Sequence, residues 1–455
     1  HTMGLALTPD PHQIDGARWL SSKKCALLAD QPRVGKTGTL IMAADDIMAD
    51  TVLTITTASG LPVWARGWRD WSAFARPLQA VGPHFRIAKA PALVTVSWNM
   101  LWRPEIRGEL LKRKWDLIIA DEAHKAKNYD NTTTQSLYGV LHDDGRELLA
   151  SAALFHKAER VWAATGTPIP HDPADLYPMM RALCPERLRA DAARGWPDVT
   201  RYEDFRDRYC HWRPKKLSPW RTIIVIMGGK REDELNARLK GFWLLRTQAE
   251  VGILQPVYET FPLGVSDKML KAANGDLKAD AILSAARQGD TRSLDMHLGP
   301  LRRITGELKA RAVIDAVHDE LDGGLDKIVL AYWHQDVGRI LKEGLSKYGV
   351  TGIDGSTSPK NRDANVEAFQ SGRCRVFLAQ IEAAGEAIDL SAAAELWFVE
   401  TVFQPKAMKQ MSLRVTNRNQ HRRPIVRVCV LEGSIDEALQ EILLRLWSTI
   451  REVLK

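Results

Sequence analysis

The feature of this chain that most constrains its fold is a short apolar run that ends in two adjacent carboxylates. Residues 117–120 (Leu-Ile-Ile-Ala) read as a buried strand, and Asp121 and Glu122 follow it directly. Asp121 can hold Mg²⁺ through its water shell, because this hard cation prefers carboxylate oxygens and keeps most of its waters. Glu122, one residue further on, can polarise an attacking water. An acidic turn after a strand is common by itself, so the reading as a nucleotide-hydrolysis site depends on the rest of the chain.

A candidate phosphate loop lies about 85 residues upstream, in the order that such a site requires. Residues 25–29 read as a buried strand, residues 30–38 as a loop and residues 40–48 as a helix. The loop contains Gly35-Lys36-Thr37, although Asp30 stands where the usual pattern has its first glycine. In such a loop the backbone N–H groups and the helix N-terminus cradle the phosphates. Lys36 would reach the β- and γ-phosphate oxygens, and the Thr37 hydroxyl would ligate Mg²⁺.

Further segments, together with these two, make the chain resemble the Swi/Snf-type ATPases of helicase superfamily two. They occur in the family's order from about residue 10 to residue 435. The segments are Pro11-His12-Gln13 with Gly16 and Trp19-Leu20, then residues 30–37, 121–128, 164–169, 201–210, 354–357, 369–372 and 381–390, and Gln410…Arg414…Gln420. The wording of residues 381–390 is closest to the annealing-helicase, fork-remodelling branch of the family.

The resemblance implies an α/β fold of two RecA-like lobes, each a parallel sheet wrapped by helices, with small helical protrusions. Short apolar runs that alternate with helical stretches agree with this, because that pattern is typical of parallel sheets. They lie at residues 52–55, 92–96, 117–120 and 160–164, and again at 328–332, 376–379 and 396–399. We expect a first lobe over 4–262 with a helical protrusion at about 172–241, a helical linker or second protrusion over 263–304, and a second lobe over 305–455 with a C-terminal helix.

The resemblance also implies the nucleotide site, with ATP and Mg²⁺ as cofactors bound between the lobes. Gln13 would read the adenine edge, Gly35, Lys36 and Thr37 would hold the phosphates and the metal, and Asp121 would orient the metal. Glu122 would activate water, and His124 would couple the nucleotide site to the opposite lobe. From the second lobe, the resemblance assigns nucleotide contacts to Gly385 and Gln410 and catalytic arginines to Arg414 and Arg418.

The implied partner is double-stranded or branched DNA, contacted through its phosphates. By resemblance the contacts in the first lobe are Thr57, Ser59, Ser97, Trp98, Asn99, Lys127 and Asn128. Those in the second lobe are His334, Gln335, Ser356 and Thr357. From the residues alone, Ser97-Trp98-Asn99 is equally readable as an ordinary cap between a strand and a helix.

The composition fits a basic globular protein. Its 455 residues leave room for two or three domains, and a net charge of +7 suits a polyanionic partner. The five cysteines show no C-x-x-C spacing, and His124 has no second ligand at metal spacing, so we expect neither zinc nor disulfides.

No apolar run is long enough to span a bilayer, and no signal peptide opens the chain. We expect a monomer, without membrane attachment, in the cytoplasm of a bacterial or phage-infected cell; protein partners stay unknown.

Two groups of residues allow both a structural and a functional interpretation. Trp64, Trp68 and Trp71 share one helix face, which is either buried in the core or a platform for base stacking. Burial is the more common outcome for aromatic residues at this spacing. The basic clusters at residues 213–216 and 421–423 are either solvated or in contact with phosphate.

The chain departs from the family pattern at Arg33, which replaces a glycine, at Glu386-Ala387, and at Asn417, which replaces the second catalytic arginine. Either Arg418 substitutes for that arginine from a non-helical segment, or Arg414 acts alone. We expect an ATP-dependent DNA translocase. The alternatives are a strand-separating DNA or RNA helicase, although no wedge or pin is visible in the sequence, and an ATP-gated binding module with low turnover.

Overall fold

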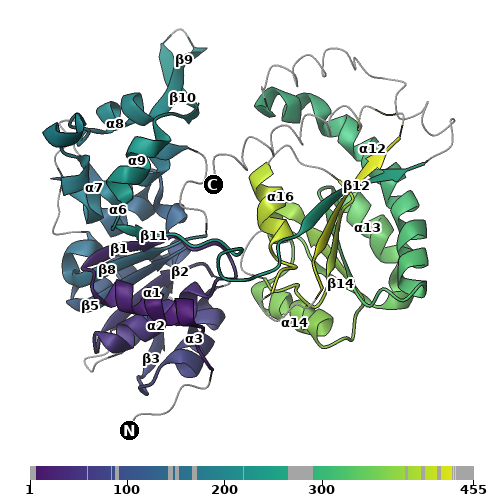
Figure 1. Cartoon of the computed structure of the whole chain (residues 1–455), viewed down its shortest axis with the longest axis horizontal. Helices are drawn as coiled ribbons and strands as arrows, with labels where there is room; N and C mark the ends of the chain where they lie inside the picture. The colour runs from purple at the N-terminus through teal and green to yellow at the C-terminus, as the bar shows by residue number, and fades with distance from the viewer. Residues whose placement is uncertain are drawn as a thin grey trace. The chain divides into compact units, whose positions relative to one another are not determined.

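The computed structural model divides the chain into two compact units, residues 1–247 and residues 248–455. Figure 1 shows a sheet with flanking helices in each unit. The structure describes residues 7–58, 60–82, 85–87, 92–141, 147–148, 153–166, 172–218, 220–264, 291–384, 388–400, 405–417, 422–432, 434 and 436. Among the helices in these ranges, none is both long and apolar enough to cross a membrane.

The first unit is built on a seven-stranded sheet in which all neighbouring strands are parallel. The strand order is β11-β1-β8-β5-β2-β4-β3. The bounds are β1 Cys25–Leu28, β2 Val52–Thr56, β3 Leu78–Ala80, β4 Leu93–Ser97, β5 Trp115–Asp121, β8 Ala158–Ala164 and β11 Trp243–Leu244. The strands predicted at 52–55, 92–96, 117–120 and 160–164 are all present. After the segment 172–241 the chain returns to this sheet, because β11 pairs with β1.

Helices cover both faces of this sheet. They are α1 Pro11–Ser21, α2 Lys36–Asp46, α3 Gly60–Trp71, α4 Trp98–Leu101, α5 Pro104–Leu111 and α6 Thr132–Tyr138. Along β5, Ile118 and Ala120 enter one hydrophobic core and Leu117 and Ile119 enter the other, as the two-residue period of a strand requires. A strand that is buried on both faces must be apolar throughout. This explains why the run before Asp121 contains no polar residue.

The tryptophans of α3 are part of the core, which confirms the structural interpretation. Trp64 and Trp68 are buried, and Trp71 packs against the same core from a partly buried position. A base-stacking role for this helix face is therefore wrong in this conformation.

The protrusion expected at 172–241 is present, but it is not purely helical. It contains η4 Pro173–Leu176, α7 Tyr177–Leu183, η5 Pro185–Leu188, η6 Ala192–Arg194, α8 Tyr202–Tyr209 and α9 Glu232–Leu239. Between α8 and α9 lies an antiparallel hairpin of β9 Cys210–Ser218 and β10 Arg221–Gly229. Residues 222–226 (Thr-Ile-Ile-Val-Ile) are all β-branched, and such side chains favour strands over helices. That run was the signal for the hairpin.

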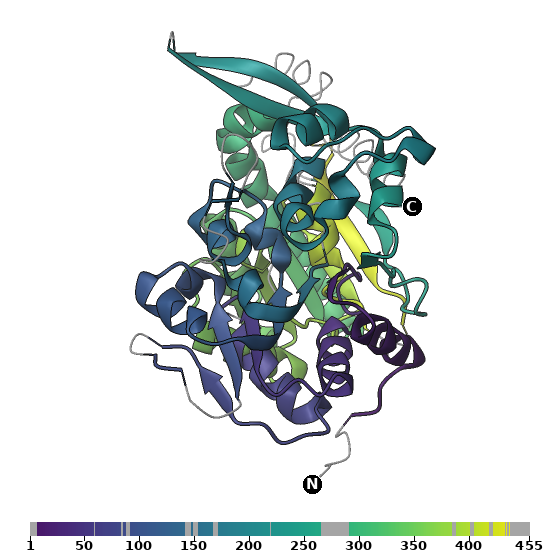
Figure 2. The same cartoon turned by 90° about the vertical axis from the view of Figure 1, so that its left-hand side faces the viewer.

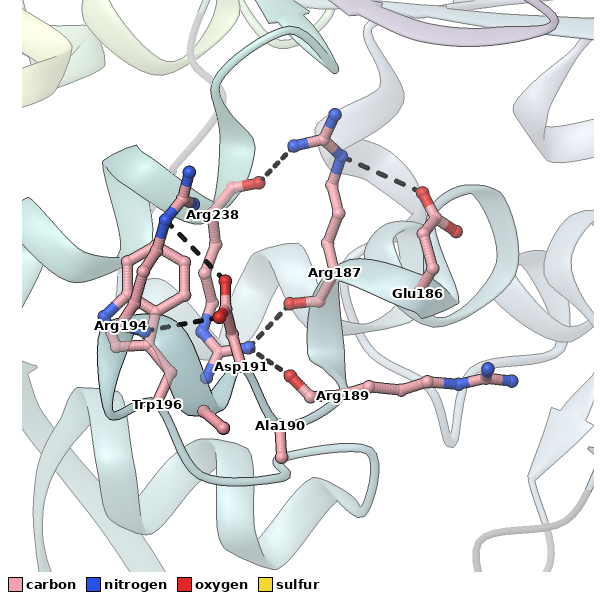
Figure 3. A pocket seen from close by; sticks show the side chains of 9 residues that line it. Glu186, Arg187, Arg189, Ala190, Asp191, Arg194, Trp196 and Arg238 are labelled. Carbon is pink, nitrogen blue, oxygen red and sulfur yellow. Dashed lines mark hydrogen bonds and ion pairs between the residues drawn. The ribbon is translucent and has the colours of Figure 1, made fainter.

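Arginines hold the protrusion together around a cavity of about 370 Å³ (Figure 3). The buried Arg238 donates hydrogen bonds to the carbonyls of Arg187, Arg189 and Pro197 at 2.7, 3.0 and 2.8 Å. Its guanidinium also lies 5.0 Å from the ring centroid of Trp196. One arginine thus joins the segments on either side of η6, and the cavity is lined by side chains that already have structural contacts.

The second unit contains a six-stranded parallel sheet in the order β12-β17-β16-β13-β15-β14. The bounds are β12 Val257–Leu263, β13 Ile328–Tyr332, β14 Val350–Ile353, β15 Val376–Gln380, β16 Glu395–Phe398 and β17 Ile425–Leu431. The helices are α12 Thr291–Asp322, α13 Gln335–Gly344, α14 Pro359–Gln370, α15 Ile381–Ala384 and α16 Pro405–Ser412. The strands predicted at 328–332, 376–379 and 396–399 agree with β13, β15 and β16.

The boundary between the units differs from the expected end of the first lobe at residue 262. It falls at Thr247 and Gln248. The reason is β12, which pairs with β17 from Val257↔Ile425 to Leu263↔Leu431 and so belongs to the second sheet. Of the helical segment expected over 263–304, the described part includes the start of α12 at Thr291. The final helix expected after Ser434 lies outside the described residues, apart from Asp436.

Candidate functional site

The nucleotide-binding residues predicted in the first unit lie at one edge of its sheet. All strands there are parallel, so their carboxyl ends share that edge, where ligands of open α/β sheets bind. The loop at residues 30–35 follows β1, Thr57 follows β2, Glu122 follows β5 and Thr165 follows β8. Strand order therefore brings together loops that are far apart in the sequence.

The phosphate loop has the conformation that anion binding needs. Gly35 is the N-cap residue of α2, with φ of 100° in the left-handed region, so glycine is required there. Lys36 is the first helical residue, and its ammonium donates to the Asp30 carbonyl at 2.8 Å. Arg33 adopts φ of 71°, which explains the glycine of the family pattern at this position. The loop keeps a left-handed residue there although the glycine is lost.

Asp30, which stands in place of the usual first glycine, fixes the loop to β11. Its buried carboxylate accepts hydrogen bonds from the backbone N–H of Arg246 at 2.9 Å and from the Arg246 Nε at 3.0 Å, and the two side chains form an ion pair. The same guanidinium donates to the His12 carbonyl. Sequence reasoning missed Arg246. Its signal was its position directly after the strand that returns to the first sheet.

Gln13 supports the phosphate loop from α1. Its Nε2 donates to the Gly35 carbonyl at 3.0 Å, and its Oε1 accepts the backbone N–H of Asp10 at 3.0 Å, which caps α1. The neighbouring His12 ring contacts the Val34 carbonyl at 2.8 Å. The Gln13 side chain is fully buried. It is therefore adjacent to the phosphate loop as expected, while its contact with adenine stays a prediction.

The carboxylate of Asp121 is held by two other elements. Its Oδ2 accepts hydrogen bonds from Thr56 Oγ1 of β2 and from Trp64 Nε1 of α3, both at 2.8 Å. Burial raises the pKa of Asp121 above its ordinary value, and the negative charge of Glu122 adds to the increase, while the two donors and Lys36 oppose it. Oδ1 makes no hydrogen bond to any residue that the structure describes. It is therefore the oxygen that could face the water shell of a metal.

Glu122, His124 and Thr165 form a second contact chain at the same edge. Glu122 has φ of 52°, a strained left-handed conformation that is typical of functional sites. His124 Nδ1 lies 3.2 Å from Glu122 Oε2 and 2.9 Å from Thr165 Oγ1. Thr165 belongs to the segment 164–169, whose residues 167–169 lie outside the described residues. The expected water-activating residue is thus linked through His124 to the loop that follows β8.

The expected Mg²⁺ suits the donors that are present. Thr37 offers a hydroxyl and Asp121 a carboxylate, and both are the hard oxygen ligands that Mg²⁺ prefers. Among the described residues, no group of three or more His, Cys, Asp or Glu side chains could enclose a metal by itself.

The predicted DNA contacts of the first unit divide into buried and exposed residues. Thr57, Ser97 and Trp98 are 7%, 5% and 4% exposed. Trp98 Nε1 donates to the Asp121 carbonyl at 2.8 Å, and Ser97 is the N-cap residue of α4. Ser97 and Trp98 therefore form the junction between β4 and α4, as in the interpretation as a strand-to-helix cap, and a DNA contact by these two residues stays a prediction.

Asn99 and Asn128 are exposed and Lys127 is half-buried, so these three remain available for a DNA contact. Lys127 lies 3.9 Å from the carboxylate of Asp175. Ser59 lies outside the described residues.

In the second unit, the predicted DNA contacts lie at the carboxyl edge of their sheet. His334 and Gln335 follow β13, and Ser356 and Thr357 follow β14. Gln380, at the end of β15, connects them, because it donates to the Trp333 carbonyl at 3.0 Å and accepts the backbone N–H of Gly355 at 2.8 Å. Sequence reasoning did not single out Gln380.

The buried Glu400 orients His334 at this edge. It accepts the backbone N–H of His334 at 2.9 Å and contacts His334 Nδ1 at 2.6 Å. Ser356 and Thr357 donate from their hydroxyls to Asp354 Oδ1 at 2.7 and 2.9 Å, which lowers the pKa of that carboxyl. Gln335 and Ser356 are exposed. The sequence had not assigned a role to Glu400, which joins β16 to β13.

The predicted arginine segment begins as a helix and continues without one. Gln410 is in α16, which ends at Ser412, so Arg414 and Asn417 are not helical. Arg414 is 9% exposed, and Asn417 donates from Nδ2 to Ser391 Oγ at 3.1 Å. Arg418 could replace the missing arginine only from a non-helical segment. The chain is non-helical from residue 413 to Asn417. Arg418 and Gly385 lie outside the described residues.

The fold and the first sheet's edge define a class of protein. Two α/β units with parallel sheets, a phosphate loop at a helix N-terminus, and two adjacent carboxylates at the end of the central strand are the parts of a two-lobe nucleoside-triphosphatase core. Comparison with protein-family models finds the SNF2-related domain over residues 12–209 and the helicase conserved C-terminal domain over residues 309–419. The chain belongs to the Swi/Snf-type ATPase family of helicase superfamily two.

Curated relatives agree with this assignment. The chain is 26% identical to the SWI/SNF-related matrix-associated actin-dependent regulator of chromatin subfamily A-like protein 1 of Xenopus tropicalis, over 98% of this chain and 44% of that protein. It is 23% identical to the DNA annealing helicase and endonuclease ZRANB3 of Homo sapiens, over 74% of this chain and 29% of that protein. The chain thus spans about half or less of the length of these relatives.

Among solved structures, the Sulfolobus solfataricus SWI2/SNF2 ATPase core in complex with dsDNA is similar. It is 19% identical, with a TM-score of 0.45, over 100% of this chain and 94% of that one.

Proposed function

We propose that this chain hydrolyses ATP with Mg²⁺ and uses the energy to translocate along double-stranded or branched DNA. The observation that supports this most is the edge of the first sheet, where the phosphate loop, Asp121 and Glu122 lie together. Membership of the Swi/Snf-type family and the annealing-helicase relatives support DNA as the partner. The net charge of +7 also suits a polyanion.

In this proposal each residue of the nucleotide site has one task. Lys36 and the N-terminus of α2 bind the phosphates, and the metal, when bound by Thr37 and Asp121, neutralises developing charge on the phosphoryl oxygens. Glu122 orients and deprotonates the attacking water, and His124 holds the Glu122 carboxylate. An arginine of the second unit, Arg414 or Arg418, would complete the site during turnover.

The carboxyl edge of the second sheet is the proposed DNA contact of that unit. Gln335 and Ser356 expose polar side chains there, and Glu400 and Gln380 hold the surrounding backbone in position. Contacts of this kind read phosphates and not bases, as movement along any sequence requires.

The test is to measure ATP turnover with no nucleic acid, with single-stranded DNA, with duplex DNA, with branched DNA and with single-stranded RNA. We expect duplex and branched DNA to stimulate turnover well above single strands, with a steep loss at higher salt because phosphate contacts release counterions. Equal stimulation by single-stranded RNA would contradict a duplex translocase and favour a strand-separating helicase. Binding of ATP and DNA without turnover would favour the ATP-gated module.

A further inference from the structure

The β9–β10 hairpin projects from the protrusion of the first unit. In Figures 1 and 2 the ribbon extends away from the sheet and helices of its own unit. Its base is anchored, since Cys210 is buried and the backbone N–H of Lys230 donates to the Tyr209 carbonyl at 2.8 Å. A strand of nine residues extends roughly 30 Å. The far end of the hairpin is therefore well separated from its anchor.

The hairpin carries positive charge that the rest of the described chain does not neutralise. Residues 210–229 contain no acidic residue, while Arg213, Lys215 and Lys216 lie in β9 and are exposed. These three cations form no ion pair with any residue that the structure describes. Arg213 pairs across the ribbon with Val225, and Lys216 pairs with Thr222, which places the two cations on opposite faces. A polyanion that surrounds the ribbon would meet cations on both faces.

The same hairpin exposes apolar side chains at its tip and along its strands. Trp220, between the two strands, is 96% exposed. Along the strands Trp212, Ile224 and Met227 are 38%, 44% and 57% exposed. Lysines and a proline such as Pro214 are common on exposed edge strands, where they prevent pairing with another chain. This does not explain an indole that is fully exposed to water at the tip.

We propose that the β9–β10 hairpin contacts DNA at a branch point. Arg213, Lys215 and Lys216 bind backbone phosphates, and Trp220 stacks on the exposed base at the fork. The positive charge of β9 favours a nucleic acid over an apolar protein as the partner. Positively charged surfaces that also carry aromatic rings are the usual binding sites for unpaired nucleotides.

The tip selects a branch over an intact duplex for a physical reason. Inside a duplex each base face is covered by its neighbours, so insertion of the indole would require unstacking, which costs a few kcal/mol per step. At a fork the last base pair has one open face, and no unstacking is needed. This inference rests on the proposed function for the identity of the partner, and adds to it a second DNA contact and a preferred DNA structure.

The decisive variant is Trp220→Ala, with Trp102→Ala as the matched control because Trp102 is also exposed, at 47%, on another element. Binding is measured by fluorescence anisotropy to a forked duplex and to a duplex closed by loops at both ends, so that its terminal pairs are covered. We expect Trp220→Ala to weaken fork binding by about 5-fold or more, the scale of one base–aromatic stack. Binding to the closed duplex and the ATP turnover that it stimulates should change less than about twofold. Unchanged fork affinity would overturn the proposal.

A fluorescent base analogue, 2-aminopurine, placed at the branch reports the stack directly. Its emission should be quenched by the wild-type protein and by Trp102→Ala, and restored with Trp220→Ala. Replacement of Arg213, Lys215 and Lys216 by Ala together should flatten the salt dependence of fork binding by roughly 2–3 units of slope, about one for each lost phosphate contact. An unchanged slope would refute the phosphate contacts.

These outcomes separate the hairpin from the proposed function. If the closed duplex fails to stimulate ATP turnover of the wild-type chain, the proposed function is wrong. If it stimulates turnover but Trp220→Ala binds the fork normally, only the hairpin proposal is wrong. A change of oligomeric state in Trp220→Ala without a change in fork binding, measured by sedimentation, would assign the hairpin to a protein contact and also overturn the proposal.

Discussion

At the scale of single residues, the position of the Asp121 carboxylate, which we propose orients the metal, depends on side chains that the sequence does not place beside it. Trp64 Nε1 and Thr56 Oγ1, which are 57 and 65 residues away in sequence, both donate to Asp121 Oδ2 at 2.8 Å. Trp98 holds the Asp121 carbonyl. These contacts immobilise the group that would orient the metal. Preorganisation of this kind is what a catalytic carboxylate needs.

Replacement of Trp64 by Phe should test this arrangement. The ring remains in the core, but the hydrogen bond to Asp121 is lost. Loss of one hydrogen bond to a carboxylate should lower the free energy of unfolding by about 1–3 kcal/mol. A looser Asp121 should also raise the Mg²⁺ concentration needed for half-maximal ATP turnover several-fold. The measurement is a Mg²⁺ titration of turnover, combined with denaturant unfolding.

Trp68→Phe is the matched control for Trp64→Phe. Trp68 is buried on the same helix, and its Nε1 makes no hydrogen bond to a described residue. The control should leave the Mg²⁺ dependence unchanged. An equal shift in both variants would mean that packing of the helix, and not the hydrogen bond, determines the position of Asp121.

Glu122→Gln should abolish turnover but preserve ATP binding. The amide keeps the shape of the side chain but cannot accept a proton from water. We expect turnover to fall by at least ~100-fold, the scale of a general-base contribution. ATP affinity is measured by calorimetry and turnover by phosphate release, with exposed Glu105→Gln as the control. Near-normal turnover in Glu122→Gln would exclude this role.

At the scale of secondary-structure elements, a buried arginine joins segments of the protrusion, beside a hydrophobic core that α7, α8 and α9 share with the first sheet. Arg238 of α9 donates to carbonyls before and after η6 and lies against Trp196. A cation that satisfies several carbonyls can order short segments whose backbone groups have no sheet or helix partner. The hairpin and α8 are attached to the same protrusion, so its order affects where the hairpin base lies.

Arg238→Met should therefore loosen the protrusion. The substitution keeps an unbranched side chain but leaves the carbonyls without their donor, which should cost about 3 kcal/mol, because a buried acceptor left without its donor costs about 1–3 kcal/mol. Hydrogen exchange at residues 187–199 should become faster, while exchange in the strands of the first sheet should not. Arg189→Met, at an exposed position lining the same cavity, is the control. Unchanged exchange at 187–199 would contradict the role of Arg238.

At the scale of the whole molecule, the two units carry complementary parts of the proposed reaction. The first has the phosphate loop and the carboxylates, and the second has the arginine segment after α16. Because α16 ends at Ser412, the rotation of about 100° per residue that a helix imposes does not apply to residues 413–417. Asn417 itself is hydrogen-bonded to Ser391 and cannot neutralise charge.

We therefore expect Arg418→Ala to reduce DNA-stimulated turnover nearly as far as Arg414→Ala, with little change in ATP affinity. Such an arginine can contribute several orders of magnitude in rate. Turnover is measured at saturating duplex DNA, and thermal unfolding is recorded in parallel because Arg414 is 9% exposed and its loss could also affect stability. If Arg418→Ala is silent while Arg414→Ala is inactive and folded, Arg414 acts alone.

The sequence by itself determined the parallel α/β class and predicted a phosphate loop and a pair of carboxylates after the central strand. Strands buried on both faces must be apolar, and phosphate loops need glycine and lysine at a helix N-terminus, so both leave local patterns. The position of β11 and the buried tryptophans of α3 could also be read from local runs.

Only the tertiary structure decided the contacts between segments that are distant in sequence. The ion pair of Asp30 with Arg246, the donors around Asp121, and the pairing of β12 with the second sheet depend on strand order, which no local pattern encodes. Burial of Ser97 and Trp98 likewise follows from the helices packed around β4. The β9–β10 hairpin had a local β-branched signal, but its exposure depends on the absence of a neighbouring described element over its tip. Local chemistry therefore predicted which residues act, and packing decided which of them are held, buried or exposed.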